Sequence, residues 1–414
     1  MKNLCKVCYI EYTFLVRFLI KYRKKLYERR TVMKIVTVID SFKGSLSSME
    51  AGRAAAEGIH RVDPQVEVLV RPLADGGEGT VQALVEGMGG KLCQVTVTGP
   101  LGKPVNCEYG ILEESKTAIL EMSAAAGITL VPREQLDPMK ATTYGVGEMI
   151  KDAILKGCRR FIVGIGGSAT NDGGVGMLQA LGYDFLDSQG QPVAWGAQGL
   201  RDLVKISDER DLPQLRECEF HIACDVTNPL CGEKGCSAVF GPQKGATPKM
   251  IGQMDEWMGN YAKITESVFP GVNSNTAGSG AAGGLGFAFL AFTPAVLESG
   301  IQIVLRELKL EQDIAQADLV ITGEGRLDEQ TAMGKAPIGV ARLAKKYGKP
   351  VIGFGGSVTD GARACNQNGI DAYFPILRSI VTLEEAMDTK RAYRNLADTA
   401  EQVFRLFALL RCDL

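Results

Sequence analysis

The chain has 414 residues, which is long enough to bury a large core, and this length predicts two or three domains. Its 45% hydrophobic and 23% charged residues are typical of a soluble globular protein. The net charge of −2 creates no field that would attract nucleic acid or an anionic membrane surface, so we expect neither as a partner.

Residues 1–32 form a basic, aromatic segment whose composition differs from the rest of the chain. The segment contains no uncharged run of signal-peptide length, and it is too short and too charged to span a membrane. We therefore expect an N-terminal extension that is not part of the fold. A membrane-surface helix is the alternative, because Phe14, Leu15, Phe18 and Leu19 could share one face.

Apolar strands and helices alternate from Met33 onward. The near-continuous apolar run Lys34–Ile39 is typical of a buried parallel strand. We expect a helix over Ser48–His60, with Ser47 or Ser48 as its cap, followed by a strand in 66–73 and a helix that starts near "DGGEGT". This rhythm predicts an α/β domain.

The middle of the chain has a different pattern of apolar residues. Between Leu92 and Ser123, short alternating runs are separated by turn residues, which predicts antiparallel strands and a new domain. A helix near Thr143–Leu155 is followed by the apolar run of "RRFIVGIGGSATNDGG", and "EFHIACDVTNPL" predicts a further strand with its exit loop.

Predicted strands and helices alternate again from about Leu285. "ADLVITGEG", "KPVIGFGGS" and "IDAYFPIL" read as strands, with helices around Pro337–Lys346 and Leu383–Leu406. We therefore expect one parallel-sheet domain from residues 33–92 plus 289–414, interrupted by a β-rich domain over 93–288.

Six predicted strand exits share one chemistry: each combines Gly or Ser with at least one acid. In open parallel sheets, ligands bind beyond the carboxyl ends of the strands. Glycine amides bind anionic oxygens, and acids beside them suit a bridging divalent cation or a general base. A single loop of this kind is explained by a helix cap or a tight turn, but six together indicate a polyanion site between two domains. The six are "IDSFKGS", "LADGGEGT", "IGGSATNDGG", "CDVTNPLCG", "TGEGRLDEQT" and "FGGSVTDG".

Several familiar site types are excluded or disfavoured. No P-loop or protein-kinase motif occurs, and "GSGAAG" has no strand before it, as a dinucleotide site would require. The chain has only two histidines, which disfavours a histidine-based triad, so we expect an Asp to accept the proton. The eleven cysteines show neither disulfide nor zinc spacing, which favours free structural thiols in a reducing compartment.

Ten stretches of the chain occur in a characteristic order: "DSFKGSLS", "ADGGEGT", "VTGPLG", "EMSAAAG", "GIGGSATNDGG", "CDVTNPLCG", "FGPQKGA", "GSGAAGGLG", "VITGEGRLDEQT" and "GKAPIGVA". In this order they resemble the type 1 bacterial glycerate kinase family, and the resemblance runs from Met33 to about Leu409. The N-terminal extension lies outside the family pattern, and "VID" stands where Ala-Pro-Asp is more usual, but Asp40 is retained.

The resemblance implies a flavodoxin-like domain interrupted by an inserted, swivelling α/β domain. It implies ATP-dependent phosphorylation of D-glycerate in the cleft between them, with Mg²⁺ as metal, 2-phosphoglycerate as the favoured product and the cytoplasm as location. The oligomeric state stays open, a homodimer being one alternative. Another small hydroxy acid as substrate, or a phosphatase or dehydrogenase, remains the rival interpretation.

Residue roles follow from the chemistry of phosphoryl transfer. Arg326 offers a planar fork for the glycerate carboxylate, and Lys43 can meet that carboxylate or the phosphoryl group. Asp75 or Asp225 is our candidate for the base. We expect catalytic roles for Asp40, Lys43, Asp75, Asp225 and Arg326; substrate binding by Ser41, Lys43, Glu78, Arg326 and Asp328; phosphate binding by Gly166, Gly167, Ser168, Thr170, Asn171, Gly355, Gly356 and Ser357; and metal binding by Asp172 and Glu324.

Overall fold

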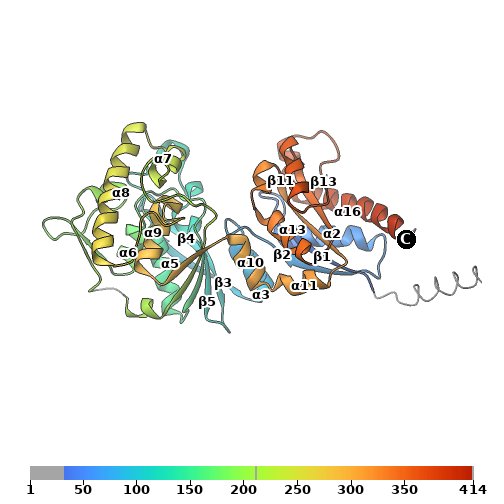
Figure 1. Ribbon diagram of the computed structural model, residues 1–414, viewed down its shortest axis with the longest axis horizontal. Helices are drawn as coiled ribbons and strands as arrows, with labels where there is room; N and C mark the ends of the chain where they lie inside the picture. Colours follow the sequence, from blue (N-terminus) through green and yellow to red (C-terminus); the bar gives the residue numbers. More distant parts are fainter. Residues whose placement is uncertain (1–31, 210–211, 413–414) are drawn as a thin grey trace, which may run out of the picture.

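The computed structural model describes residues 32–209 and 212–412 and has two lobes, each built on its own sheet (Figure 1). Apart from Val32, the expected N-terminal extension lies outside the described residues, as do Cys5 and Cys8. Within the described part of the chain, no helix is both long enough and apolar enough to cross a membrane.

One lobe contains a five-stranded sheet in the order β13-β12-β11-β1-β2, with every neighbouring pair parallel. Read from β2, this is the 2-1-3-4-5 order of flavodoxin-like folds. Its strands come from both ends of the described chain, which confirms the expected fold class. They are β1 (Lys34–Ile39), β2 (Glu67–Pro72), β11 (Leu319–Leu327), β12 (Val351–Val358) and β13 (Ala372–Pro375).

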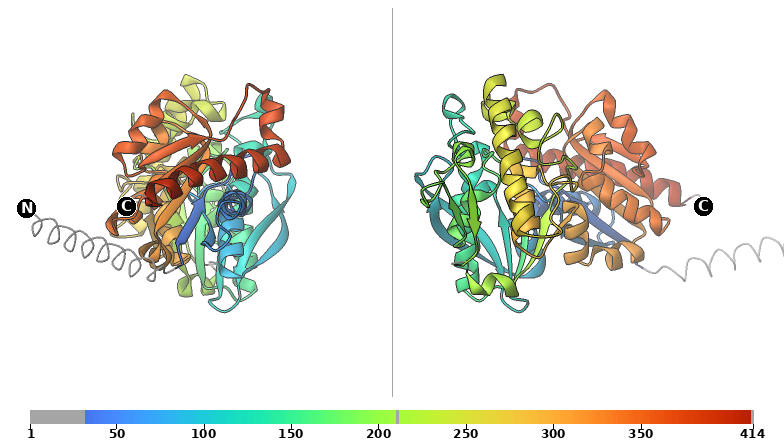
Figure 2. Two further views of the ribbon diagram at one scale, coloured as in Figure 1. Left: turned by 90° about the vertical axis from the view of Figure 1, so that its right-hand side faces the viewer. Right: turned by 60° about the vertical axis from the view of Figure 1, so that its left-hand side comes forward.

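Helices cover both faces of this sheet. Small residues of α2, including Ala51 and Ala55, let α16 pack closely beside it over one face, through Leu396 and Ala397 (Figure 2). The opposite face is covered mainly by α3, α10, α11 and α13. The helices of this lobe are α2 (Ser48–His60), α3 (Thr80–Met88), α10 (Gly300–Glu307), α11 (Leu310–Gln316), α12 (Glu329–Ala332), α13 (Ala336–Lys346), α14 (Arg363–Gln367), α15 (Leu383–Met387) and α16 (Thr389–Cys412).

The helix ends of this lobe confirm one expectation and correct another. Ser47 caps α2 in a capping box with Glu50, as one of the two expected caps. The single helix expected over Leu383–Leu406 is wrong. Asp388 takes an extended conformation between α15 and α16, and its carboxylate accepts a hydrogen bond from the amide of Arg391 at 2.8 Å, so it ends one helix and starts the next.

The other lobe contains a six-stranded mixed sheet in the order β10-β9-β6-β5-β4-β3. The pairs β3–β4 and β4–β5 are antiparallel, as the alternation between Leu92 and Ser123 predicted, and the other pairs are parallel. The strands are β3 (Lys91–Thr98), β4 (Pro104–Leu112), β5 (Thr117–Glu121), β6 (Arg160–Gly164), β9 (Glu219–Ala223) and β10 (Ala295–Glu298), and a small separate sheet joins β7 (Asp184–Leu186) to β8 (Lys205–Ser207).

A large aromatic core holds this second lobe together. Phe161 and Phe220 stack with ring centroids 4.8 Å apart, and Phe220 also meets Phe289 on a helix beside the sheet. Across both lobes, the eight cysteines from Cys93 to Cys365 are free, and five of them are buried. The helices of this lobe are α4 (Ser123–Ala126), α5 (Tyr144–Leu155), α6 (Val175–Ala180), α7 (Cys236–Phe240), α8 (Pro248–Val268) and α9 (Leu285–Phe292).

The lobes meet through α3 and α10, which lie between the two sheets in Figure 1. One hydrophobic cluster there joins Val36 and Val38 of the parallel sheet to Ile119 and Ile162 of the mixed sheet. Position 288 falls inside α9, and β10, which follows α9, still pairs with β9 of the mixed sheet. The chain therefore returns to the parallel-sheet lobe only after β10. The domain division at residues 92 and 288 stays a prediction.

Candidate functional site

The central cavity of the parallel lobe lies where β1 and β11 end side by side, which is the point where the strand order reverses. Ligands of open parallel sheets bind at this point. We call this cavity the sheet pocket. Its charged lining consists of Asp40, Lys43, Asp75, Glu324, Arg326, Asp328 and Lys335, and its small polar lining of Ser41, Ser45, Gly325, Gly356, Ser357 and Asn395.

The loop after β1 presents Lys43 to solvent at the mouth of this pocket. Phe42 and Leu46 are buried and form an isolated β-bridge, which anchors both ends of the loop. Gly44 takes a φ of +82°, which glycine adopts without strain, so the chain can turn at the tip. Asp40 lies deeper, 5% exposed, and accepts a hydrogen bond from the amide of Ser41 at 2.7 Å.

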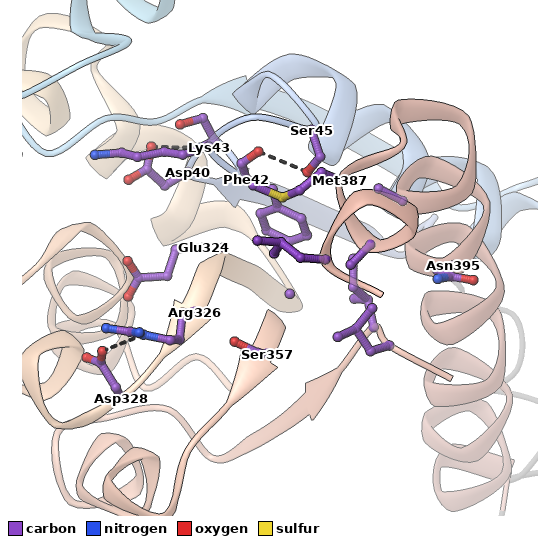
Figure 3. Close-up of a pocket in the computed structure, with 18 of the residues that line it drawn as sticks. Asp40, Phe42, Lys43, Ser45, Glu324, Arg326, Asp328, Ser357, Met387 and Asn395 are labelled. Carbon is purple, nitrogen blue, oxygen red and sulfur yellow. Dashed lines mark hydrogen bonds and ion pairs between the residues drawn. The ribbon is translucent and has the colours of Figure 1, made fainter. Parts of the chain in front are cut away.

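The end of β11 supplies the opposite wall. Glu324 accepts a hydrogen bond from the hydroxyl of Thr331 at 2.6 Å, and the Nε of Arg326 donates to Asp328 at 3.0 Å. Asp328 in turn caps α12, which fixes its position. Figure 3 shows Glu324 between Asp40 with Lys43 on one side and the Arg326–Asp328 pair on the other. Within the described residues, the two terminal nitrogens of Arg326 donate no hydrogen bond to a protein acceptor.

Crowded carboxylates perturb the proton affinity of this site. Burial raises the pKa of Asp40 to about 7; the negative charges of Asp75 and Glu324 add to this, while the amide of Ser41 and the charge of Lys43 oppose it. Burial likewise raises the pKa of Glu324, against the hydrogen bond from Thr331. The pocket therefore favours a proton or a cation among its acids at neutral pH.

A second cavity opens on the mixed-sheet lobe, beneath the loop that follows β6. We call it the loop pocket. Asp75 lines this pocket as well as the sheet pocket, so the two cavities share one acidic residue. Burial raises the pKa of Asp225, and the amide of Gly300 donates to its Oδ1 at 3.2 Å. The lining consists of Asp75, Gly76, Gly77, Ile128, Ile165, Gly166, Gly167, Ser168, Ala223, Cys224, Asp225, Val226, Phe240, Gln243, Lys244, Ala281 and Ala282.

The structure adds two features to the site that the sequence reasoning missed. Lys244 is 1% exposed yet lines the loop pocket; the motif "FGPQKGA" pointed to its segment, but a lone lysine beside Pro and Gly reads as a solvated loop residue. An apolar wall also lines the sheet pocket, and it includes Phe42, Leu383 and Met387. The second half of that wall follows β13, far from the glycine-rich motifs, so no spacing signal marked it.

Some expected site residues lie outside both pockets. Glu78 is exposed, and Gly355 is buried in the pairing between β11 and β12. Thr170 and Asn171 are fully buried: the carbonyl of Thr170 accepts from Lys244, and the side-chain amide of Asn171 donates to Ser237 at 2.9 Å. Their roles in binding stay predictions without support from this geometry.

Asp172 has a structural environment. Its carboxylate accepts hydrogen bonds from the amide and hydroxyl of Thr143, both at 2.8 Å, and from the amides of Gly174 and Gly176. Burial raises its pKa, and these donors oppose that effect. Because its oxygens tie α5 to α6 and line neither pocket, Asp172 as a metal ligand stays a prediction that the geometry does not favour.

The two similar stretches "GIGGSAT" and "GFGGSVT" fold differently. In the first, β6 ends at Gly164, and the following glycines leave the sheet as a loop. In the second, β12 continues through Gly356 and Ser357 to Val358, and its backbone pairs with β11. Only the first stretch therefore leaves consecutive backbone amides outside a sheet, and the two stretches line different pockets.

The donor chemistry of the sheet pocket suits magnesium bound to a nucleotide. Within residues 32–209 and 212–412, no three His, Cys, Asp or Glu side chains converge on one metal position. Magnesium, however, commonly takes only one or two protein carboxylates and completes its shell with phosphate oxygens and water. Asp75 and Glu324 are the carboxylates that could hold it. Each raises the pKa of Asp40 by its negative charge, and a bound cation would offset that charge.

His221 contacts two carboxylates rather than the cysteines close to it in the sequence. His221 lies between Glu219 and Glu298, at 2.6 Å from one carboxylate and 2.5 Å from the other. The "GSGAAG" segment, Gly278–Gly283, has no strand before it in the structure. It packs instead against the loop after β6, where the amide of Gly173 donates to the carbonyl of Gly283 at 3.0 Å.

Comparison with known proteins places this arrangement in one family. Residues 35–408 match the family model described as "Glycerate kinase family". A "Glycerate kinase" of Haemophilus influenzae is 48% identical over 376 residues, which cover 91% of this chain and 99% of that protein. A "Glycerate 2-kinase" of Escherichia coli K12 is 47% identical over 372 residues, covering 89% and 98% of the two chains.

A solved structure agrees with the fold. The crystal structure of a candidate glycerate kinase 2 from Salmonella typhimurium LT2 superposes with a TM-score of 0.85 at 48% sequence identity. The match covers 92% of this chain and all of that one.

Proposed function

This chain belongs to the glycerate kinase family, and from that premise we propose that it transfers the terminal phosphoryl group of ATP to D-glycerate, with 2-phosphoglycerate as the product. The reaction would take place where the sheet pocket and the loop pocket meet. Another short hydroxy acid as the acceptor is the alternative. We also place the enzyme in the cytoplasm, because its free cysteines suit a reducing compartment.

The observation that carries this proposal is the position of Asp75 in both pockets. A kinase must bring a small acceptor and a polyphosphate to one point and hold them in line. Two cavities of different chemistry that share one acidic residue meet that requirement. Asp75 is held in place because its Oδ1 accepts a hydrogen bond from the amide of Gly77 at 3.0 Å.

In this proposal glycerate occupies the charged end of the sheet pocket. Arg326 and Lys43 bind its carboxylate, and the ion pair with Asp328 orients the guanidinium. The Ser41 hydroxyl lies in the same lining and can bind a substrate hydroxyl.

The phosphates then occupy the loop pocket, where Gly166, Gly167 and Ser168 expose backbone amides, and Gly356 and Ser357 line the acceptor side.

The transfer forms one bond and breaks another. The substrate hydroxyl oxygen attacks the terminal phosphorus, the bond to the leaving ADP oxygen breaks, and the hydroxyl proton passes to a carboxylate. Asp40 suits that role because its pKa of about 7 lies near the operating pH, whereas the sequence alone had favoured Asp75 or Asp225. Magnesium bound by Asp75 and Glu324 would neutralise phosphate charge.

A coupled assay of ATP consumption over a panel of short hydroxy acids tests the proposal, with phosphorus NMR identifying the phosphorylated hydroxyl. We expect D-glycerate to be the preferred acceptor. Asp75→Asn should lower kcat by roughly a hundredfold or more, because it removes a positioned charge from the point of transfer. Asp63→Asn, at an exposed site beyond α2, is the control. No ATP consumption with any acid, or full activity of Asp75→Asn, would contradict the proposal.

A further inference from the structure

Lys244 carries a buried positive charge that forms no ion pair. The side chain is 1% exposed, and its ammonium donates to the hydroxyl oxygen of Ser168 at 2.7 Å and to the carbonyl of Thr170 at 2.6 Å. Both acceptors are neutral. Within the described residues, no carboxylate lies at ion-pair distance from this ammonium, so its charge is left without a counterion.

Such an arrangement is costly unless an anion completes it. A buried charge is stable only when it is paired and hydrogen-bonded, and Lys residues are rarely fully buried otherwise. Burial lowers the pKa of Lys244 to about 8, although Cys236 and Asp172 raise it. Asp172 does not provide the missing partner, because its oxygens already accept hydrogen bonds from Thr143, Gly174 and Gly176.

Hydrogen-bond donors lie beside Lys244 in the lining of the loop pocket. Because Ser168 accepts from the ammonium, its own hydroxyl proton stays available to a ligand in the loop pocket. The amides of Gly166, Gly167 and Ser168 have no acceptor among the residues that the structure describes. Gly167 has a φ of +74°, a conformation in which successive amides can face one anion.

We propose that Lys244 is the fixed cation of the loop pocket and that it binds phosphoryl oxygens of the nucleotide, together with the Ser168 hydroxyl and the amides of Gly166 and Gly167. This inference rests on the proposed function and assigns one side of the cleft to the nucleotide. The Lys244–Ser168 hydrogen bond pre-organises the donors, so a phosphate enters a site already oriented for it.

A purely structural role is the competing explanation. The ammonium links the segment 242–244 to the loop after β6, and this brace alone could hold the lobe together. A brace and a phosphate site differ in one measurable respect: only the phosphate site changes nucleotide affinity in protein that remains folded.

Isothermal titration of Lys244→Met with a non-hydrolysable ATP analogue and Mg²⁺ distinguishes the two. Truncating one partner of a desolvated charge pair should weaken binding of the analogue roughly thirtyfold or more. The affinity for D-glycerate should stay within about threefold of the wild type, because glycerate is assigned to the other pocket. Lys234→Met, at an exposed lysine that precedes α7, is the matched control and should bind as the wild type.

Ser168→Ala is the second variant and keeps the ammonium. Loss of one hydroxyl donor should weaken binding of the analogue by about fivefold. This result supports the proposal even where Lys244→Met does not fold. Unchanged analogue affinity in either folded variant overturns it, and so does selective loss of D-glycerate binding. If the wild type binds the analogue but phosphorylates no hydroxy acid, the proposed function fails and the phosphate site stands.

Discussion

Replacing Asp40 by Asn should make the protein more stable at pH 8 than the wild type, although it removes a residue of the candidate site. Burial first, and then the charges of Asp75 and Glu324, raise the pKa of Asp40 to about 7 from 3.8. Asn keeps the oxygen that accepts from the amide of Ser41 at 2.7 Å, but it cannot ionise. The variant therefore avoids the cost of a buried negative charge among other acids.

The sign and size of the effect follow from proton linkage. Between pH 4 and pH 7 the folded protein retains a proton on Asp40 that the unfolded chain has released, so stability falls as the pH rises through this window. With folded and unfolded pKa values of about 7 and 3.8, the loss between pH 5 and pH 8 is about 2.5 kcal/mol. Asp40→Asn should not show this loss.

Urea unfolding at half-unit steps from pH 5 to pH 8 measures the difference between the variant and the wild type. We expect this difference in unfolding free energy to shift toward the variant by about 2.5 kcal/mol across the window. Asp328→Asn is the control in the same pocket. Although burial opposes them, hydrogen bonds from Thr331 and Arg326 lower the pKa of Asp328, so the effect of this variant should be constant from pH 5 to pH 8. An equally flat profile for Asp40→Asn would refute the reasoning.

Two further predictions concern substrate affinity and packing. Arg326→Lys keeps the charge but loses the planar fork, so kcat/KM for D-glycerate should fall roughly tenfold, about 1.4 kcal/mol; nucleotide affinity measured by titration should stay unchanged, and a loss there instead would assign Arg326 to the phosphate. Gly58→Ala should lower the unfolding free energy by about 1–3 kcal/mol, because a Cβ on this residue of α2 would lie 2.1 Å from the carbonyl oxygen of Ala397 in α16. Gly252→Ala, in a helix of the other lobe with open space around it, should instead stabilise the protein by about 0.5 kcal/mol in thermal or urea unfolding, and equal effects of the two glycine variants would contradict the packing argument.

Local patterns in the sequence were enough to define most individual elements. The helix over Ser48–His60 has the expected bounds, because its capping residues and its apolar face are all encoded within a few neighbouring positions. The alternation between Leu92 and Ser123 likewise predicted antiparallel pairing. The break at Asp388 escaped prediction, because the helical periodicity continues on both sides of it.

The candidate site shows where local patterns end. The sequence identified Asp40, Asp75 and Arg326 from loops that follow apolar runs, since parallel strands present their carboxyl ends at one edge. It could not show that Asp75 belongs to two cavities, because that depends on how the lobes pack. Nor could it separate Asp172 from the acids of the site, since a buried carboxylate among amides has the same local sequence as an exposed one.

The sequence by itself therefore determined the order of the elements, the two kinds of sheet and most of the loops that line the candidate site. Those features depend on neighbouring residues and on periodicity, which a single chain records directly. Only the tertiary structure decided which loops face one another, which acids lie close enough to raise the pKa of Asp40, and which lysine is buried. Burial and charge proximity arise from contacts between residues far apart in the chain, and they have no local signature. For example, the backbone amide of Lys34 in β1 donates to the carboxylate of Asp318, which directly precedes β11.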